Sequence, residues 1–264
     1  MQLYHHPLSM NSNKVRLALE EKNVDYTAHR VNPLKARNLD PEFFRQNPSG
    51  TLPVLKNGSI VLCESLPILQ YIDRINEPLG DNKVQHDRVE EWVKKIDEWD
   101  AKPFTLSHIP DRMLRFFSRF KRRVVIARMA KNPDLANKYH TKLNSMHAME
   151  EKLKDTEALE ANKEQLLNML DDAEDQLSTT EYMAGFEFTI ADAAMIPVLA
   201  RIELLKLNEE YLEPRPRLLE YWERMKSRAS YKKVIGGYSS QLKQLKLVLP
   251  SACNVGVRNV FKRF

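Results

Sequence analysis

The sequence has few cysteines and no long apolar run. Its 264 residues include two cysteines, Cys63 and Cys253, which lie too far apart to form a Cys-x-x-Cys motif. Neither a disulfide framework nor a cysteine-based zinc site is therefore expected. No stretch approaches the roughly 18 consecutive apolar residues of a membrane-spanning helix, and Met1 to His5 lacks the charged-then-apolar pattern of a signal peptide. A cytoplasmic location is therefore expected.

The histidines give no sign of a metal site. Seven of them are scattered along the chain. His140 and His147 share one face of an expected helix, and they are interpreted as surface residues. No metal is predicted.

Acidic residues are missing from the end of the chain, where the last one is Glu223. Residues 1–237 are neutral overall, and the net charge of +5 lies in residues 238–264. Beyond Gly237 the charged residues are Lys243, Lys246, Arg258, Lys262 and Arg263. Apolar residues recur near helical spacing from Leu242 on, a pattern typical of an interfacial helix on anionic lipid. Peripheral association with an anionic membrane surface through residues 239–264 is one expectation, and a tail that is packed on the helical domain or disordered is the other.

The first 76 residues alternate between strand and helix patterns. Strands are expected at residues 3–5, 26–31, 53–55 and 59–62, with helices at 13–22 and from Glu64 to about Ile75. Asn57-Gly58 marks the hairpin between the last two strands. This βαβ and then ββα order predicts a four-stranded mixed sheet with helices packed on it.

The rest of the chain reads as helical, because glycine is nearly absent between Gly80 and Gly185. The predicted organisation is an α/β domain at residues 1–78, a linker at 79–84, an all-helical domain at 85–237 and the basic amphipathic tail at 238–264.

Two segments of the helical half carry opposite charge. Residues 112–131 contain eight basic residues and no acid, whereas residues 149–187 contain twelve acids and three lysines. We interpret them as two long antiparallel helices with complementary solvent faces. The alternative is a surface for nucleic acid or anionic lipid built on Arg115, Arg119 and Arg122. Since no nucleic-acid motif accompanies them, a nucleic-acid partner is not predicted.

Thr51-Leu52-Pro53-Val54, followed by Glu64-Ser65, predicts a ligand site. A proline that begins a strand cannot donate a ladder hydrogen bond, which leaves the backbone of Leu52 available to a ligand. Glu64-Ser65 with Pro67 marks a helix start, whose unpaired N–H groups attract a carboxylate. The two features together fit a peptide-like ligand that carries a carboxylate.

The motifs, taken in order, resemble those of the soluble glutathione transferases. His6-Pro7-Leu8-Ser9 with Lys14-Val15-Arg16, then Asn47 to Val54, then Glu64-Ser65 are similar to the three glutathione-binding stretches of that family. Phe188-Thr189-Ile190-Ala191-Asp192 resembles the capping motif of its helical domain. The resemblance covers essentially the whole chain and is greatest to the plant class named after a bacterial tetrachlorohydroquinone dehalogenase. It implies a thioredoxin-like α/β domain followed by an all-α domain with a long helical insert.

The resemblance also implies chemistry. A transferase of this type activates the thiolate of glutathione for attack on small hydrophobic electrophiles, and some reduce peroxides with it. Ser9 matches the catalytic serine of the serine-type classes, with Asn11 and Ser12 as rivals in the same loop. Because this loop contains no cysteine, the thiol–disulfide exchange of the cysteine-type relatives is not expected. Glutathione is the expected co-substrate.

Each part of glutathione has an expected partner by resemblance. Ser65 and its backbone N–H would bind the γ-glutamyl carboxylate, and Glu64 the amino group. Leu52 beside Thr51 would pair its backbone with the cysteinyl unit, with Pro53 in the cis form. For the glycyl carboxylate the candidates are Arg37, Asn38, Leu39 and Asp40, of which Arg37 is the chemically sensible choice.

The second substrate is less defined. Residues from Trp92 to Phe104 and from Phe116 to Phe120 are expected to line the electrophile pocket, and a homodimer is compatible with the sequence. Two other functions remain open: a non-catalytic carrier of glutathione or hydrophobic ligands, and a membrane-associated scaffold with the same fold. The presence of Ser9, Pro53 and Glu64-Ser65 together favours the enzyme.

Overall fold

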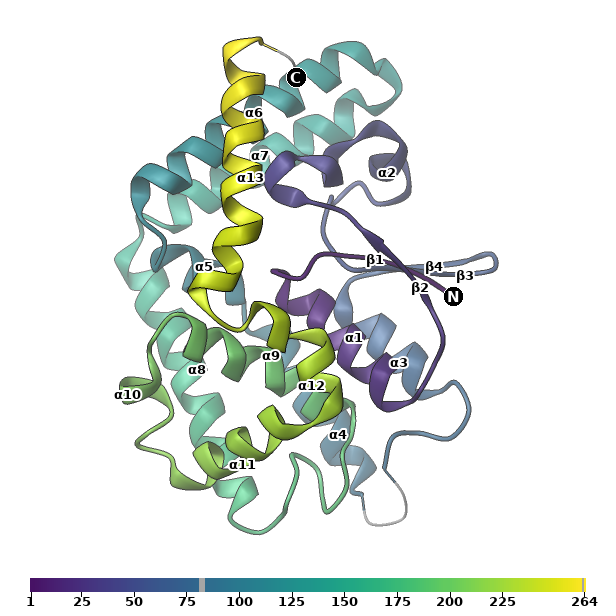
Figure 1. Cartoon of the computed structure of the whole chain (residues 1–264), viewed down its shortest axis with the longest axis vertical. Coiled ribbons are helices and arrows are strands. Elements are labelled where there is room, and N and C mark those ends of the chain that lie inside the picture. The colour runs from purple at the N-terminus through teal and green to yellow at the C-terminus, as the bar shows by residue number, and fades with distance from the viewer. Residues whose placement is uncertain (81–83, 263) are drawn as a thin grey trace.

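The computed structural model describes residues 1–80, 84–262 and 264 (Figure 1). The predicted linker at 79–84 therefore lies partly outside the described residues, as does Arg263 of the tail. Within the described part of the chain, no helix is both long and apolar enough to cross a lipid bilayer.

The N-terminal elements form a small sheet with helices. They are, in chain order, β1 (Gln2–His5), α1 (Met10–Glu21), β2 (Thr27–Arg30), η1 (Pro33–Lys35), η2 (Arg37–Leu39), α2 (Pro41–Gln46), β3 (Val54–Asn57), β4 (Ile60–Cys63) and α3 (Ser65–Asp73). The strand order is β2-β1-β3-β4, with β1 parallel to β2 and antiparallel to β3. The predicted four-stranded mixed sheet is confirmed.

Local signals explain these elements. Gly58 adopts a φ of +59° at the tip of the β3–β4 hairpin, a conformation that costs glycine little. Helix α1 begins at Met10, three residues earlier than predicted, because the Ser9 side chain caps it. Figure 1 shows α1 and α3 on one side of the strands and α2 on the other.

The C-terminal half is helical, as predicted. Its elements are α4 (His86–Glu98), α5 (Ala101–Ser107), α6 (Asp111–Lys131), η3 (Pro133–Leu135), α7 (Ala136–Lys152), α8 (Thr156–Leu177), α9 (Ile190–Leu204), α10 (Asn208–Tyr211), α11 (Pro216–Ser227), α12 (Ala229–Val234), η4 (Gly236–Tyr238) and α13 (Gln241–Val260). Helices α6 and α7 form the expected long insert.

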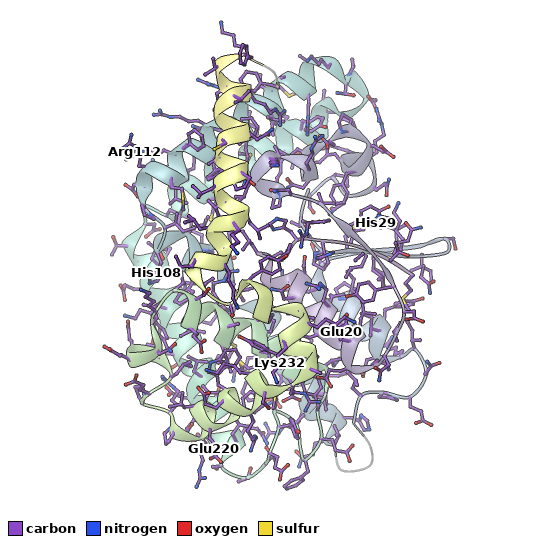
Figure 2. The ribbon with its side chains drawn as sticks, viewed as in Figure 1. Glu20, His29, His108, Arg112, Glu220 and Lys232 are labelled. Atoms are coloured by element: carbon purple, nitrogen blue, oxygen red, sulfur yellow. The ribbon has the colours of Figure 1, made fainter. Side chains whose placement is uncertain are left out.

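The larger of two hydrophobic cores joins α1 and α3 to the helical bundle through α9. Helix α9 is apolar on all sides and starts with a capping box, in which the Asp192 carboxylate accepts from the Thr189 backbone N–H at 2.8 Å. This confirms the predicted capping motif. Helix α12 closes the same core, and Glu20 of α1 pairs with Lys233 of α12 at 2.5 Å; Figure 2 labels Glu20 and, on α12, Lys232.

The second core lies between η1, η2 and α2 of the N-terminal half and α6, α7 and α13. Phe44 stacks on Tyr139 with ring centroids 4.3 Å apart, and the Tyr139 hydroxyl donates to the Leu39 carbonyl at 2.8 Å. Val255 of α13 and Phe120 of α6 are fully buried here. The insert and the tail are therefore packed against the N-terminal domain.

The tail is an ordered helix with two different faces. One face packs on η1 and α6, where the Asn32 amide donates to the buried Ser251 hydroxyl at 3.1 Å. The opposite face leaves apolar side chains exposed: Leu242, Leu245, Leu249, Val257, Val260 and Phe261. Of the two expectations for the tail, packing on the rest of the protein is observed. The exposed face of α13 nevertheless carries both apolar and basic side chains.

The predicted charge complementarity between residues 112–131 and 149–187 is largely wrong. Helix α6 packs against α7, most of which lies outside both charged segments. Only the end of α7 belongs to the acidic segment, and there Glu150 accepts a hydrogen bond from Arg122 at 2.7 Å. Acids of α8 pair elsewhere: Asp172 with Lys95 of α4, and Asp171 with Arg215 just before α11. Helix α8 packs against α5 and α11 instead of α6.

Candidate functional site

Ser9 lies at the end of the loop between β1 and α1, where it caps the first turn of α1. Its hydroxyl accepts a hydrogen bond from the backbone N–H of Ser12 at 3.2 Å and donates to the carbonyl oxygen of Leu52 at 3.3 Å. The side chain is half-buried, so a ligand can reach it. The unpaired N–H groups at the start of α1 favour a negative charge at this point.

The two rivals of Ser9 have different surroundings. Ser12 is fully buried, and its hydroxyl accepts from the His6 backbone N–H at 3.4 Å, so it belongs to the loop's internal bonding. Asn11 is exposed in the first turn of α1. The loop itself is anchored from the helical half, because the half-buried Arg201 of α9 donates to the Leu8 carbonyl at 2.8 Å.

The loop before β3 presents its backbone in a fixed shape. The Leu52–Pro53 peptide bond is cis, as predicted. Gly50, at a φ of +60°, has its carbonyl held by the Asn38 amide at 2.6 Å. The Asn47 amide donates to the Thr51 carbonyl at 2.9 Å, and Thr51 itself is exposed.

The start of α3 has an unusual backbone. Glu64 adopts a φ of +76°, a left-handed conformation that a residue with a side chain adopts only when its surroundings impose it. The Ser65 hydroxyl is buried and donates to the Asp97 carboxylate of α4 at 3.1 Å. Glu64 is exposed beside it.

Two residues near Ser65 have no predicted role toward it, although Lys14 belongs to a predicted glutathione-binding stretch. Asp97 comes from the helical half, and Lys14 of α1 lies close enough for its charge to interact with that carboxylate. Burial lowers the pKa of Lys14 to about 8, while Asp97 opposes this shift. Ser65, Asp97 and Lys14 form a buried polar group behind the start of α3.

His5 and His6 line the loop from β1 to Ser9. Burial, with the nearby charges of Arg30 and Lys121 adding to it, lowers the pKa of His6 to about 4. Burial likewise lowers the pKa of His5 to about 3. Both imidazoles are therefore neutral at pH 7, and the Leu8 backbone N–H donates to Nδ1 of His6 at 3.3 Å.

Three lysines of the helical half, Lys102 of α5, Lys121 of α6 and Lys142 of α7, lie near the loops that carry His6 and Ser49. The Lys142 ammonium of α7 donates to the Ser49 carbonyl at 2.5 Å. Burial lowers the pKa values of Lys121 and Lys142 to about 8, and in each case the charge of Lys102 lowers it further. Among the described residues, no carboxylate forms an ion pair with these three lysines. Sequence reading saw only a basic helix here, because the direction of each side chain depends on how the insert packs.

In its observed interactions, Arg37 contacts Asp40 and residues of the tail rather than the predicted glutathione-binding residues. It begins η2, where its guanidinium pairs with Asp40 at 3.4 Å, and it lines a pocket together with residues of the tail. Asn38 is the member of this segment that contacts the loop before β3. Leu39 is buried in the second core, so it offers no side chain to a carboxylate.

Four aromatic residues that were expected to line an electrophile pocket are buried in the two cores. Trp99 and Phe104 pack against each other in the first core, with ring centroids 5.4 Å apart. Phe117 and Phe120 lie in the second core. Because all four rings are buried, they hold the helices together, and Lys102 and Lys121 are the residues near the loop instead.

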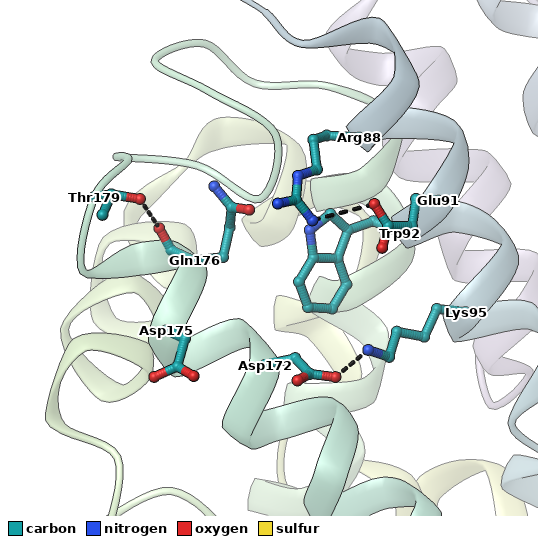
Figure 3. Close-up of a pocket in the computed structure, with 8 residues that line it drawn as sticks. All are labelled: Arg88, Glu91, Trp92, Lys95, Asp172, Asp175, Gln176 and Thr179. Atoms are coloured by element: carbon teal, nitrogen blue, oxygen red, sulfur yellow. Dashed lines mark hydrogen bonds and ion pairs between the residues drawn. The ribbon is translucent and has the colours of Figure 1, made fainter.

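A separate polar pocket of about 300 Å³ lies between α4 and α8 (Figure 3). Its charged lining is paired internally: Arg88 with Glu91 at 3.1 Å, and Lys95 with Asp172. Of the residues predicted for the electrophile pocket, Trp92 and Lys95 line it, whereas none of the predicted glutathione-binding residues does. Nor do the described residues include a cluster of His, Cys, Asp or Glu able to hold a metal ion.

Comparisons with known proteins match both halves of the chain. Residues 1–74 match the family model described as "Glutathione S-transferase, N-terminal domain", and residues 130–229 match "Glutathione S-transferase, C-terminal domain". The chain is 47% identical to glutathione S-transferase TCHQD of Arabidopsis thaliana, with 100% of each chain covered. It is 27% identical to the tetrachloro-p-hydroquinone reductive dehalogenase of Sphingobium chlorophenolicum, covering 88% of this chain and 94% of the other.

The fold has solved counterparts. The structure of Gtt2 from Saccharomyces cerevisiae superposes with a TM-score of 0.63 over 89% of this chain and 100% of that one. At 22% sequence identity, this likeness supports the fold alone.

Proposed function

Since the chain belongs to the glutathione S-transferase family, we propose that it is a serine-type glutathione transferase in which Ser9 activates the thiol of bound glutathione. One observation carries this proposal: the Ser9 hydroxyl lies at the start of α1 and in contact with Leu52, the residue whose backbone would align the cysteinyl unit. The Ser9 hydroxyl and the backbone that would bind the cysteinyl unit of glutathione are therefore next to each other.

The required effect is modest. A free thiol has a pKa of about 8.5, and lowering it by about two units takes roughly 2.7 kcal/mol of preferential thiolate stabilisation. A charge-assisted hydrogen bond from Ser9 supplies part of this energy, and the N-terminus of α1 supplies more. The N–H of Ser12 polarises the Ser9 hydroxyl further by donating to it. No separate base is needed, because the thiol proton leaves to solvent.

We assign the rest of glutathione by the same reasoning. The exposed Glu64 would meet the amino group of the γ-glutamyl end, and Ser65 with the N-terminus of α3 its carboxylate, with Asp97 orienting the Ser65 hydroxyl. Thr51 and Leu52 would border the cysteinyl unit, and Asn11 would lie at the mouth of the site. For the glycyl carboxylate Arg37 remains a candidate, and Lys142 beside Ser49 is a second one.

The second substrate is proposed to be a small electrophile, with peroxide reduction as a related activity. Three lysines near the loop, Lys102, Lys121 and Lys142, favour electrophiles that carry a negative charge. An assay with 1-chloro-2,4-dinitrobenzene and with an anionic electrophile, at equal glutathione concentration, tests the proposal. Glutathione binding without turnover of any electrophile would favour a carrier, and the absence of binding would favour a scaffold.

We also propose that the protein is cytoplasmic and associates peripherally with anionic membranes. The exposed apolar face of α13, flanked by Lys243, Lys246 and Lys262, supports this proposal. Each basic residue near an anionic surface contributes about 1 kcal/mol, so binding is expected to weaken with salt. Cosedimentation with vesicles that contain phosphatidylserine is the measurement.

A further inference from the structure

The tail, the end of α6 and the N-terminal domain border a second pocket. It has a volume of about 530 Å³, within the range of small-molecule sites. It is lined by Arg37, Lys131, Asn254, Arg258, Lys262 and Phe264. Four of these six residues are cations, and none has a carboxylate side chain.

The cations come from three separate parts of the chain. Arg37 belongs to η2, Lys131 ends α6, and Arg258 and Lys262 belong to α13 and the residues just after it. Cations brought together in the folded state raise the local positive potential, which attracts an anion. The burial of Arg258, together with the charges of Arg128 and Arg37, lowers its pKa, which reflects the same positive potential.

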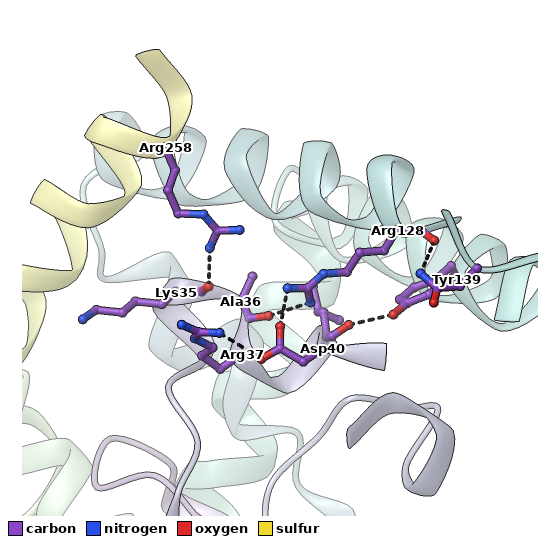
Figure 4. A network of polar contacts seen from close by, with 9 residues as sticks. Lys35, Ala36, Arg37, Asp40, Arg128, Tyr139 and Arg258 are labelled. Atoms are coloured by element: carbon purple, nitrogen blue, oxygen red, sulfur yellow. Dashed lines mark hydrogen bonds and ion pairs between the residues drawn. The ribbon is translucent and has the colours of Figure 1, made fainter. Parts of the chain in front are cut away.

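Figure 4 shows how the arginines are held in place. The Arg258 guanidinium donates to the Lys35 carbonyl at 3.1 Å and lies over the Phe120 ring, 4.9 Å from its centroid. Arg128 donates to the Ala36 carbonyl at 3.0 Å and pairs with Asp40. Asp40 also pairs with Arg37, so one carboxylate serves two arginines beside the pocket. Two of the four lining cations, Arg37 and Arg258, are therefore held by contacts within the protein.

We propose that this basic pocket binds an anion that carries two or more phosphate groups. Arginine guanidinium groups match phosphate oxygens in pairs, and lysines add compact positive charge. A single phosphate would leave most of the volume empty, whereas a polyphosphorylated ring fits the pocket's size and its four cations. Such groups occur as soluble inositol phosphates and as lipid headgroups. The exposed Val260 and Phe261 next to Lys262 suit the lipid source.

Titration calorimetry with inositol 1,4,5-trisphosphate tests the pocket on the full-length protein. The double variant Lys131→Gln/Lys262→Gln removes two charges from its lining. The matched control, Lys138→Gln/Lys232→Gln, removes two exposed charges that do not line it. We expect the dissociation constant to rise at least tenfold in the pocket variant and to stay within twofold in the control, with both retaining the melting temperature of the parent protein.

Vesicles distinguish the two sources. Cosedimentation compares vesicles containing phosphatidylinositol 4,5-bisphosphate with phosphatidylserine vesicles of equal charge. Preference for the former, reversed by inositol trisphosphate, identifies the lipid headgroup as the source, and trisphosphate binding without that preference identifies a soluble ligand. Absence of trisphosphate binding, or equal losses in the pocket and control variants, overturns the proposal.

Discussion

The hydroxyl of Ser9 lies 3.3 Å from the carbonyl oxygen of Leu52, 43 positions later in the chain. This contact joins the start of α1 to the cis-proline loop, and both groups are needed by the proposed ligand. The Leu52 carbonyl would accept from the cysteinyl N–H, while Ser9 would turn its proton toward the sulfur. Binding therefore exchanges one internal hydrogen bond for two to glutathione.

Replacement of Ser9 should lower catalysis more than stability. Ser9→Ala removes a hydrogen bond to a charged sulfur, worth about 1.5–3 kcal/mol, so kcat/KM for glutathione conjugation should fall by roughly 10- to 100-fold. The pKa of bound glutathione, followed by thiolate absorbance, should rise in parallel. Because Ala also removes a helix cap, about 1 kcal/mol of stability should be lost.

Two further variants separate the roles of Ser9. Ser9→Asp keeps the cap but repels a thiolate, so stability should return without activity. Ser9→Thr should restore both. Full activity in Ser9→Ala together with a loss in Asn11→Ala would move the role to Asn11.

The glycyl carboxylate can be assigned by comparing two cations. If Lys142 binds it, Lys142→Met should raise the KM for glutathione about tenfold with little change in kcat, since the lost contact lies away from the sulfur. Arg37→Met should then leave the KM unchanged. The opposite pattern would assign the carboxylate to Arg37.

Asp97 should matter through its two neighbours. Asp97→Asn leaves Lys14 buried without a countercharge, which should cost about 1–3 kcal/mol in urea unfolding and raise the KM for glutathione through Ser65. Adding Lys14→Met should recover stability but not the KM, because the buried charge is gone while Ser65 still lacks its carboxylate. The exposed Glu90→Gln on the same helix is the control.

Acid should destabilise the protein through His6. The unfolded state binds a proton below a pH of about 6.5, whereas burial keeps His6 neutral in the folded state down to a pH of about 4. Stability therefore falls as the pH drops through this window, by up to about 3 kcal/mol for this one group. Urea unfolding between pH 7 and 4 should show a shallower fall in His6→Gln, and no such change in the exposed His86→Gln. Equal slopes in all three proteins would contradict this account.

The two faces of α13 should respond differently to substitution. Leu245→Ser/Val260→Ser on the exposed face should reduce vesicle binding about tenfold or more and leave the melting temperature unchanged. Ile126→Ser, an exposed apolar residue of α6, controls for lost surface hydrophobicity. Val255→Ser on the buried face should instead cost about 2 kcal/mol of stability. If Leu245→Ser/Val260→Ser binds vesicles as well as the parent protein, the proposal that α13 associates with membranes is wrong.

Local signals in the sequence were enough to predict the sheet and the capping box, because each depends on neighbours in the chain. The cis form of Pro53 followed from the resemblance to the family. The predicted start of the first helix was three residues late, since polar residues around Ser12 suggested the cap that Ser9 provides. Leu52-Pro53 and Glu64-Ser65 were predicted from their own chemistry, whereas the role of Ser9 followed from the resemblance to the family.

The contributions of the helical half could not be read from the sequence. Asp97 and Lys142 come from helices whose packing decides which residue faces the N-terminal domain. The direction of Arg37 depends on a tail more than 200 positions later, and the burial of Phe117 depends on the second core. Hydrophobic periodicity predicted the helix of the tail without indicating which face would be covered.

The second core has a consequence for how this protein can be studied. Helix α13 holds η1 through Asn32 and Lys35, and the same segment continues into Asn38, which fixes Gly50 beside Thr51. A truncated protein would lose this support, and its glutathione affinity would fall whether or not the tail ever touches a lipid. Deletion of the tail would therefore lower glutathione affinity and membrane binding at the same time. Point substitutions in the full-length chain separate the two effects.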